Sequence, residues 1–456
     1  MEQPLITALA TAQGVGGIAI VRLSGAGAWN AVKKIFKPKA QLDWEKVSGF
    51  SLHYGLIEWE NKIYDEVLLA LMKKEASYTR EEMAEIQCHG GFIAARRIIE
   101  LLLNLGAQLA APGEFTKRAF LNGRLDLSQA EAVIETIEAR GEKDLEFSLR
   151  RLEGEKGKNY LLIRNDLLNL VAQTEAVIDF PEDGLDEEVS KNIETQVRSM
   201  LVKLDKEIKK AEEGSIYREG IKTVILGRTN VGKSSLMNAL LQEERAIVTD
   251  IPGTTRDTIE EKVILAGVPL SIIDTAGIRE TQDPVEKIGV NRSRDALKNC
   301  DLVLVVLDSA QGFTPEDKEL LTAVEDKKAI VLLNKCDIAT EDENLEKALG
   351  SLPYLYISAK EGNNLENLGK LIEKMFLTGA INESDDKWVG NLRHKESFIA
   401  ARYHLNEVLH GIAAKVPLDF QVIDLRSALD ALGEISGESI STEIINRIFS
   451  DFCIGK

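Results

Sequence analysis

The sequence predicts a chain of mixed α/β and α class: an N-terminal α+β domain, a helical domain, and a doubly wound α/β domain inserted into the helical one. Strand signals are frequent before residue 120, and apolar runs alternate with helical segments between residues 220 and 378. Such alternation is typical of a largely parallel sheet. Helical spacing dominates on both sides of that region. We expect boundaries at 1–120, 121–219, 220–378 and 379–456, with the second and fourth segments forming one helical domain.

The N-terminal region combines strands and helices without an obvious catalytic motif. Apolar runs at 17–24 and 67–72 predict strands, and the spacing of apolar residues over 92–105 predicts an amphipathic helix. Three charged residues stand in apolar or turn contexts, namely Arg22, Glu85 and Arg124. From the residues alone we interpret them as capping or surface-pairing groups, with a ligand site as the alternative.

The helical segments are interpreted as structural supports. Asp126-Leu-Ser-Gln129 is a capping start for a helix, and helical spacing resumes at 189–213 after turn residues at 179–184. Further helices are expected at 394–415 and 419–432. Cys453 lies three residues from the C-terminus, and from sequence alone we interpret it as a small buried side chain, with a reactive thiol as the alternative.

The inserted domain begins with a phosphate-binding pattern. Gly227-Arg-Thr-Asn-Val-Gly-Lys-Ser234 follows the apolar run Ile221–Leu226 and precedes a helical segment. Its spacing fits Gly, four residues, Gly, Lys and then Ser or Thr. Backbone N–H groups of such a turn and of the helix N-terminus converge on an anion. We therefore expect Lys233 to contact the β- and γ-phosphates and the Ser234 hydroxyl to bind Mg²⁺.

Three later motifs, each at the end of an apolar run, specify guanine. They are Asp274-Thr-Ala-Gly277, Asn334-Lys-Cys-Asp337 and Ser358-Ala-Lys360. The Asp337 carboxylate can accept hydrogen bonds from guanine N1–H and the 2-amino group, which adenine lacks. Asn334 and the backbone of Ala359 would complete recognition near O6, and Asp274 would reach Mg²⁺ through water. Each motif alone could be a helix cap, but all four in order predict GTP binding.

The candidate GTP-binding residues come from these four motifs and from the segment 249–255. They are Asn230, Val231, Gly232, Lys233, Ser234, Ser235, Thr249, Asp250, Ile251, Pro252, Gly253, Thr254, Thr255, Asp274, Thr275, Ala276, Gly277, Asn334, Lys335, Asp337, Ser358, Ala359 and Lys360.

Two positions bear on hydrolysis. Thr255 lies in the expected first switch loop, where its hydroxyl would be the second protein ligand of Mg²⁺, with an ordinary loop threonine as the alternative. Ile278 follows the Asp-Thr-Ala-Gly motif, where many small GTPases place a glutamine that orients the attacking water. Isoleucine can neither donate nor accept a hydrogen bond, so hydrolysis would need another group to position the water.

Composition limits the classes of function. The 456 residues carry 74 acidic against 56 basic side chains, a net charge of −18, which argues against a broad, non-specific grip on nucleic acid or anionic lipid. We find no secretory signal or transmembrane run. The four cysteines have no disulfide or zinc spacing. We expect a cytoplasmic protein with reduced thiols and without a membrane span.

Five stretches of the sequence carry a family resemblance. They are the phosphate loop, Asp250-Ile-Pro-Gly-Thr-Thr-Arg-Asp257, His89-Gly-Gly91, Pro112-Gly-Glu-Phe-Thr-Lys-Arg-Ala-Phe-Leu-Asn122 and the closing Phe452-Cys-Ile-Gly-Lys456. Together they resemble the MnmE (TrmE) family of tRNA modification GTPases over essentially the whole chain. The last two are more specific than the GTPase motifs, which many families share. The resemblance implies a folate-binding-like N-terminal domain that also dimerises, and a Ras-like GTPase domain.

The resemblance also implies a reaction. Family members work with the FAD-containing flavoprotein MnmG (GidA), in a heterotetramer or larger complex, on C5 of the wobble uridine of certain tRNAs. They add an aminomethyl or carboxymethylaminomethyl group, whose one-carbon unit comes from 5,10-methylene- or 5-formyl-tetrahydrofolate. By matching motif, Arg22, Glu85, Arg124 and Lys456 would line the folate site. Cys453 matches the family's tail cysteine and is a candidate catalytic residue whose chemical role stays open.

Finally, the resemblance implies potassium-activated hydrolysis across a homodimer. Asn230 matches a K⁺ ligand, and Thr249, Ile251 and Thr254 would line the same ion. Glu286 matches the family's water-positioning glutamate and joins Lys233 among the candidate catalytic residues. Two rival classes stay open, a ribosome-assembly or signalling GTPase without covalent tRNA chemistry, and a folate-binding scaffold with a vestigial GTPase. Because the chain is acidic, we expect weak tRNA binding without MnmG.

Overall fold

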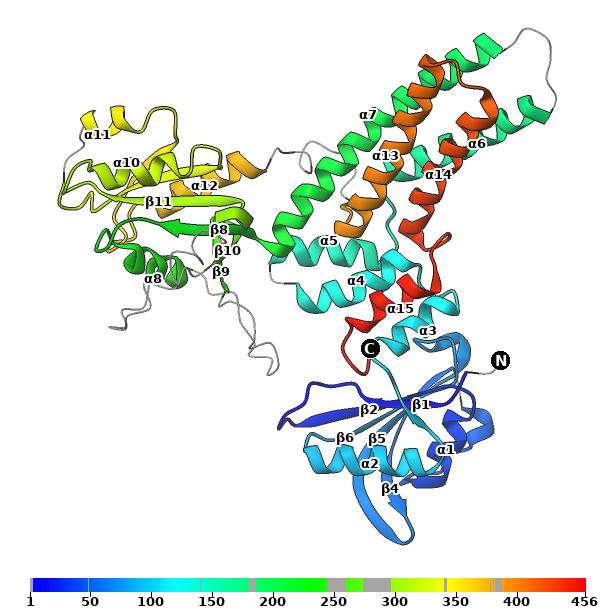
Figure 1. Ribbon diagram of the computed structural model, residues 1–456. Coiled ribbons are helices and arrows are strands. Elements are labelled where there is room, and N and C mark those ends of the chain that lie inside the picture. The colour runs from blue at the N-terminus through cyan, green and yellow to red at the C-terminus, as the bar shows by residue number, and fades with distance from the viewer. Residues whose placement is uncertain are drawn as a thin grey trace.

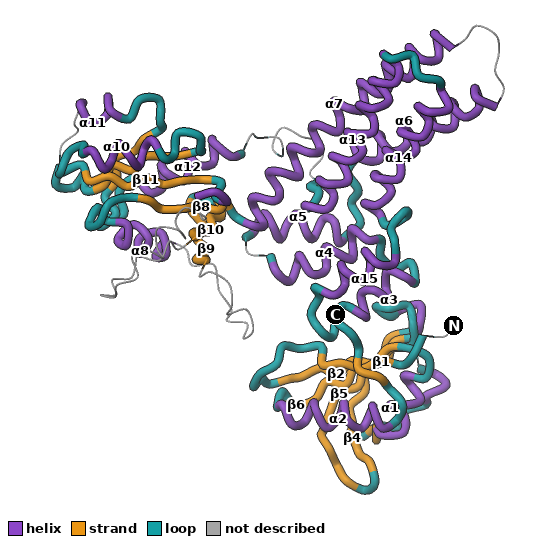
Figure 2. Tube along the Cα trace, in the orientation of Figure 1, coloured by secondary structure: helices purple, strands orange, loops and turns teal. Residues whose placement is uncertain are grey.

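A computed structural model describes residues 3–47, 49–139, 141–179, 186–243, 260–273, 297–339, 343–377, 379, 381 and 388–456. Figure 1 shows an N-terminal sheet domain at one end, an elongated helical domain above it, and a second sheet domain attached to the side of the helices. Figure 2 shows that the strands fall into these two separate groups, with helices between them. The predicted combination of α+β, helical and inserted doubly wound parts is confirmed.

The N-terminal domain is built on a seven-stranded sheet in the order β3-β4-β5-β6-β2-β1-β7. Its neighbouring strands run antiparallel except for the parallel pair β1 and β7. The strands are β1 (Ile6–Leu9), β2 (Ile18–Ser24), β3 (Phe36–Pro38), β4 (Phe50–Trp59), β5 (Lys62–Met72), β6 (Met83–His89) and β7 (Gln108–Leu109).

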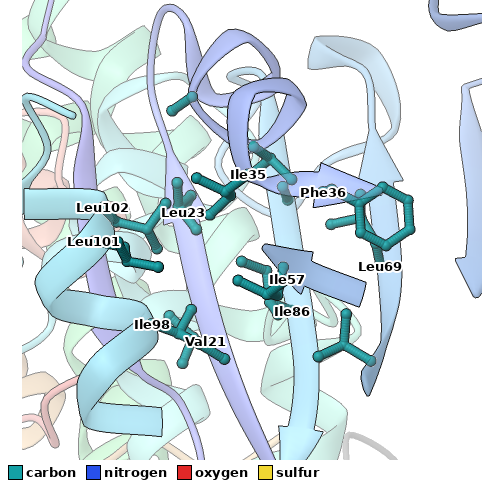
Figure 3. Packing of buried hydrophobic residues seen from close by; sticks show 14 of the residues in the cluster. Val21, Leu23, Ile35, Phe36, Ile57, Leu69, Ile86, Ile98, Leu101 and Leu102 are labelled. Carbon is teal, nitrogen blue, oxygen red and sulfur yellow. The ribbon is translucent and has the colours of Figure 1, made fainter. Parts of the chain in front are cut away.

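One face of this sheet is covered by α1 (Ala28–Ile35) and α2 (Phe92–Asn104). Figure 3 shows the core between sheet and helices, where Leu23 and Val21 of β2 lie near Leu102 and Ile98 of α2. Short 3₁₀ helices occur at Trp44–Lys46 and Lys74–Ala76. The strands predicted at 17–24 and 67–72 and the helix predicted at 92–105 are confirmed, because alternating or helically spaced apolar residues do face this core.

Eight helices described by the structure form the middle of the molecule. They are α3 (Glu114–Leu121), α4 (Leu127–Glu138), α5 (Glu142–Leu152), α6 (Lys158–Asp179), α7 (Asp186–Glu219), α13 (Leu392–Ala413), α14 (Leu418–Ser436) and α15 (Thr442–Ser450). The long helices α6, α7, α13 and α14 share one apolar core, which includes Leu167, Leu204, Phe398 and Leu425. The expected capping start is confirmed, since Asp126 and Gln129 form a capping box at the beginning of α4.

The inserted domain has a six-stranded sheet in the order β13-β12-β11-β8-β10-β9, parallel except for β9, which pairs antiparallel with β10. The strands are β8 (Ile221–Leu226), β9 (Glu260–Leu265), β10 (Val268–Ile273), β11 (Leu302–Asp308), β12 (Ala329–Asn334) and β13 (Tyr354–Ile357). The described helices are α8 (Lys233–Glu243), α10 (Pro315–Thr322), α11 (Glu343–Ala348) and α12 (Leu365–Phe376). β9 and β10 form a hairpin whose turn residues, Ala266 and Gly267, have left-handed conformations.

The domains meet where α7 ends. Gly220, at φ +80°, separates α7 from β8, and the chain returns to the helical domain at Asn391, the N-cap of α13. After α15 the last residues lie beside the N-terminal sheet domain, as the C-terminal label in Figure 1 shows. Within the part of the chain that the structure describes, every helix is too short or too polar to cross a bilayer.

Candidate nucleotide and tail sites

The phosphate loop has the backbone that an anion cradle requires. Asn230 adopts a left-handed conformation at φ +65°, which asparagine tolerates better than most residues. Gly232 has φ +101°, and a Cβ there would lie 2.1 Å from Asn334 Nδ2. A Cβ at Gly227 would lie 2.5 Å from the Val306 carbonyl oxygen. The two glycines of the motif are therefore required by close approach of other chain segments, and the loop that results fits a phosphate group.

Lys233 already lies within this cradle. Its Nζ donates to the carbonyl oxygens of Gly227 at 2.8 Å and Arg228 at 2.6 Å. Burial lowers the pKa of the Lys233 ammonium. An anion bound in the loop would oppose that shift, because an opposite charge favours the charged form. Ser234 and Ser235 follow in the first turn of α8, beside the helix N-terminus, and both residues are exposed.

A side-chain contact with a residue outside the motif connects the phosphate loop to α10. Arg228 Nε donates to Asp317 Oδ1 at 2.8 Å, and Asp317 is buried at the start of α10. The other oxygen of Asp317 accepts from the Thr314 backbone N–H and hydroxyl, which forms the capping box of α10. The sequence analysis did not single out Asp317. Its signal is the Thr-Pro-Glu-Asp capping pattern at 314–317.

The guanine-specifying motifs come together at the ends of β12 and β13. Asn334 Nδ2 donates to the Val231 carbonyl at 2.7 Å, and its Oδ1 accepts from the Ala359 N–H at 2.9 Å. Asn334 therefore ties the phosphate loop to the Ser358-Ala-Lys360 loop, and the Ala359 amide is already engaged within the protein. The expectation that these two groups also bind guanine O6 stays a prediction.

The remaining groups of the same motifs have different environments. Asp337 and Lys360 are exposed, whereas Ser358 is buried. Lys335 has a left-handed backbone at φ +70°, and its Nζ pairs with Asp308 Oδ2 at 2.6 Å. The Asp337 carboxylate is thus accessible at the carboxyl ends of parallel strands, where doubly wound sheets bind ligands.

Other candidates lie outside the described residues. They are Thr249, Asp250, Ile251, Pro252, Gly253, Thr254, Thr255, Asp274, Thr275, Ala276, Gly277 and Glu286, together with Ile278. The described chain nevertheless fixes where both segments are attached, since β9 begins at Glu260 and β10 ends at Ile273.

A second cluster of predicted residues forms around the C-terminal tail. Arg22 of β2 and Glu85 of β6 are register partners, and Arg22 Nε pairs with Glu85 Oε1 at 2.8 Å. Arg22 Nη1 also donates to the Gly455 carbonyl at 2.9 Å. The Phe115 N–H donates to the Lys456 carbonyl oxygen at 3.1 Å. The tail is therefore held between the sheet and the start of α3.

The cluster is cationic and contains an aromatic ring. The guanidinium carbons of Arg124 and Arg22 lie 4.6 and 5.9 Å from the centroid of the Tyr78 ring. Lys456 is half-buried, and burial, followed by the charge of Arg22, lowers the pKa of its ammonium. Sequence reasoning missed Tyr78, which stands in the turn between β5 and β6 and carries no motif. Such a set of groups fits an anionic, partly aromatic ligand.

One prediction about the tail is wrong. Cys453 is exposed, not a buried apolar side chain. Its neighbours explain the difference, because Phe449 and Phe452 fill the pocket against Ala119 and Leu125, and the Cys453 carbonyl accepts from the Gly113 N–H. The thiol is left facing solvent, where it is open to reaction.

Two family models together match most of this chain. A family model described as the TrmE N-terminus matches residues 5–124, and one described as the MnmE helical domain matches residues 127–453. This chain belongs to the MnmE family. The protein named tRNA modification GTPase MnmE from Desulforamulus reducens is 45% identical over all of both chains. Its namesake from Finegoldia magna is 46% identical over 99% of both chains.

A solved structure of Era matches part of this chain. Aquifex aeolicus Era bound to GDP and AlF₄⁻ is 27% identical and covers 40% of this chain and 65% of Era, with a TM-score of 0.27. Because this TM-score is low, the assignment of a GTPase fold to the inserted domain rests on the sheet order and the phosphate loop of this chain.

Proposed function

We propose that this chain is a K⁺-dependent GTP hydrolase that, with the flavoprotein MnmG, modifies C5 of the wobble uridine of certain tRNAs. The observation that carries this proposal is the seating of the C-terminal tail beside Arg22 and Glu85, in a chain that also has a formed phosphate loop. A GTPase switch without covalent chemistry would need the phosphate loop but not the seated tail. Near-complete alignment with proteins named tRNA modification GTPase supports the same choice.

In the nucleotide site, this chain's residues would bind and orient GTP. Lys233 and the α8 N-terminus would hold the phosphates, and Asp337 would select guanine. Ser234 and Thr255 would hold Mg²⁺, with Asp274 reaching it through water, and bound Mg²⁺ would neutralise charge on the phosphates. Glu286 would position the attacking water. The accessible Asp337 and the seated Lys233 support this assignment.

A potassium ion would complete the nucleotide site. Asn230 would supply a side-chain oxygen, and the residues Thr249, Ile251 and Thr254 would surround the same ion. The left-handed, exposed Asn230 on the phosphate loop supports this part, because its side chain has room to meet an ion beside the phosphates. Two such domains would meet in a homodimer.

In the tail site, Arg22, Arg124 and Lys456 would hold a tetrahydrofolate derivative, with Glu85 accepting hydrogen bonds from its ring. The approach of Arg22 and Arg124 to the Tyr78 ring, with the Lys456 ammonium close enough to feel the charge of Arg22, supports the assignment, since folates combine a flat ring with carboxylates. When bound, 5,10-methylene- or 5-formyl-tetrahydrofolate would supply the one-carbon unit. The exposed Cys453 would stand beside it, available for a covalent step. FAD would be held by MnmG, and tRNA would be bound by the complex in the cytoplasm.

The proposal is tested by mass-spectrometric analysis of tRNA nucleosides from cells that lack this chain. Complementation uses the wild type or the Cys453→Ser variant. We expect the C5-modified wobble uridine to disappear without the chain and to return with the wild type only. If both proteins restore it, Cys453 has no chemical role. If the nucleoside never changes, the chain is better explained as an assembly or signalling switch.

A further inference from the structure

A single buried carboxylate contacts both connections between the nucleotide domain and the helical domain. Glu135 of α4 is 3% exposed. Its carboxylate accepts from Arg218 Nη1, in the last turn of α7, and from Asn391 Nδ2 at 3.0 Å, at the N-cap of α13. Arg218 stands just before β8 and the phosphate loop, and Asn391 stands where the chain returns. Both connections of the nucleotide domain are thereby held by hydrogen bonds to α4.

The three partners of Glu135 differ in how easily they can leave. Arg151 of α5 is almost fully buried and pairs with the second oxygen of Glu135. Arg218 is 35% exposed and can therefore be solvated if it separates. A buried carboxylate that loses all its partners is strongly destabilised. Here Arg151 and Asn391 would stay in place, so the Arg218 contact can open without leaving the Glu135 charge uncompensated.

The space needed for such a movement lies beside Arg218. A cleft of about 700 Å³ separates the α4–α5 connection, with Ala139 and Glu142, from the β9–β10 hairpin, with Lys262 and Pro269. Gly220 lies at the joint with φ +80°, and a Cβ there would lie 3.2 Å from the Ser271 amide nitrogen. In chain order, β9 follows the expected first switch loop and β10 directly precedes Asp274, so the cleft is lined by the strands that connect to both segments.

The same network continues toward the C-terminal tail. Glu131, one helical turn before Glu135, accepts from Asn391 Nδ2 at 3.0 Å and from Arg393 Nε at 2.5 Å. Arg393 also donates to the carbonyl of Glu434 at 2.7 Å, near the end of α14. From there α15 leads to the tail beside Arg22. A continuous set of charge-assisted hydrogen bonds thus joins the entrance of the nucleotide domain to the helices that carry the tail.

We propose that Glu135 is a positioning residue: through its releasable pair with Arg218 it sets the orientation of the nucleotide domain and couples GTP hydrolysis to tRNA modification. This inference rests on the proposed function. It assigns the coupling to the single ion pair between Glu135 and Arg218. A general contact between the domains would instead distribute the effect over many residues.

The test separates coupling from hydrolysis in the full-length chain. We expect Arg218→Ala to hydrolyse GTP within about twofold of the wild-type rate, because Arg218 touches no group of the phosphate loop. Modified wobble uridine in complemented cells should fall by about tenfold, the effect of losing roughly 1.4 kcal/mol of coupling. Arg218→Lys should restore most of the modification, since the charge and reach are kept.

A matched control is Arg198→Ala on the same helix, which removes an exposed pair with Glu194 and should change neither readout. Glu135→Gln provides a second variant that keeps the side-chain shape, and combining it with Arg218→Ala should add little further loss. The proposal is wrong if hydrolysis and modification fall together in Arg218→Ala, or if neither falls. If wild-type complementation itself restores no modified uridine, the proposed function fails and not this coupling.

Discussion

The phosphate loop and the tail site are assembled in opposite ways. The loop takes its residues from one stretch of eight, and its geometry is set by backbone conformation at Asn230 and Gly232. The tail site takes Arg22, Glu85, Arg124 and Lys456 from four separate parts of the chain, and strand pairing and tail docking bring them together. A local motif predicts its own geometry, whereas a dispersed site is recognisable in sequence only through family resemblance.

The largest expected effect is that of Gly232→Ala on the phosphate loop. The new Cβ would meet Asn334 Nδ2 at 2.1 Å in a left-handed backbone, so the loop must change shape. We expect GTP affinity, measured by isothermal titration calorimetry, to fall by more than about 100-fold, roughly 3 kcal/mol. Gly267→Ala is the control, since its turn at φ +81° has open space around the Cβ. That variant should lose about 1 kcal/mol of stability and keep GTP affinity. Equal affinity in the two variants would contradict the assigned geometry.

A second prediction concerns His394, a buried residue of the helical domain whose pKa, like the tail site, depends on tertiary contacts. Burial lowers the pKa of His394 to about 4, although the Glu131 carboxylate, 3.4 Å from its Nε2, opposes the shift. The folded protein therefore keeps His394 neutral where the unfolded chain, with a pKa near 6.5, binds a proton. Stability should be unaffected by this group above pH 6.5 and fall as the pH drops toward 4.

The loss from His394 should reach about 3 kcal/mol in the free energy of unfolding, because each pKa unit is worth about 1.4 kcal/mol. Denaturant unfolding at several pH values measures it. His394→Asn should reduce the slope between pH 6.5 and 4, and the exposed His410→Asn should leave it unchanged. An identical slope in His394→Asn would show that other groups control acid unfolding.

Arg22→Ala tests the tail site with a somewhat smaller effect. The change removes the pair with Glu85 and the hydrogen bond that holds the Gly455 carbonyl. We expect affinity for 5-formyl-tetrahydrofolate to fall by about 10- to 100-fold, the value of one charge-assisted contact plus looser docking of the tail. Arg96→Ala, an exposed arginine paired with Glu100, is the control for fluorescence or calorimetric titration. Unchanged affinity in Arg22→Ala would remove this site from the folate proposal.

The smallest expected effect concerns the contact between Arg228 of the phosphate loop and Asp317 of α10. Arg228→Ala removes the contact with buried Asp317, which still caps α10 through Thr314. We expect the KM for GTP to rise by about three- to tenfold with little change in kcat, since about 1 kcal/mol of loop positioning is lost. Arg150→Ala, an arginine paired with Glu146 on α5, provides the matched control in the same steady-state assay. A lower kcat at unchanged KM would contradict a role in loop positioning.

Sequence by itself determined the elements and the nucleotide specificity. Apolar spacing predicted β2, α2 and the strands of the inserted sheet, because helix and strand periods are local properties. Four ordered motifs predicted GTP binding, because a phosphate cradle needs glycine and lysine at fixed chain spacing. Capping residues such as Asp126 also showed where a helix begins.

Only the tertiary structure decided which distant groups meet. It brought Arg22 and Arg124 to the Tyr78 ring, left Cys453 exposed, and engaged Asn334 with Val231 and Ala359. It also gathered Arg218 and Asn391 on Glu135, a carboxylate that looks like an ordinary helix-surface residue in the sequence. Such contacts depend on the packing of whole helices and strands. Their energy depends on how deeply the polar groups are buried, which the local sequence does not show.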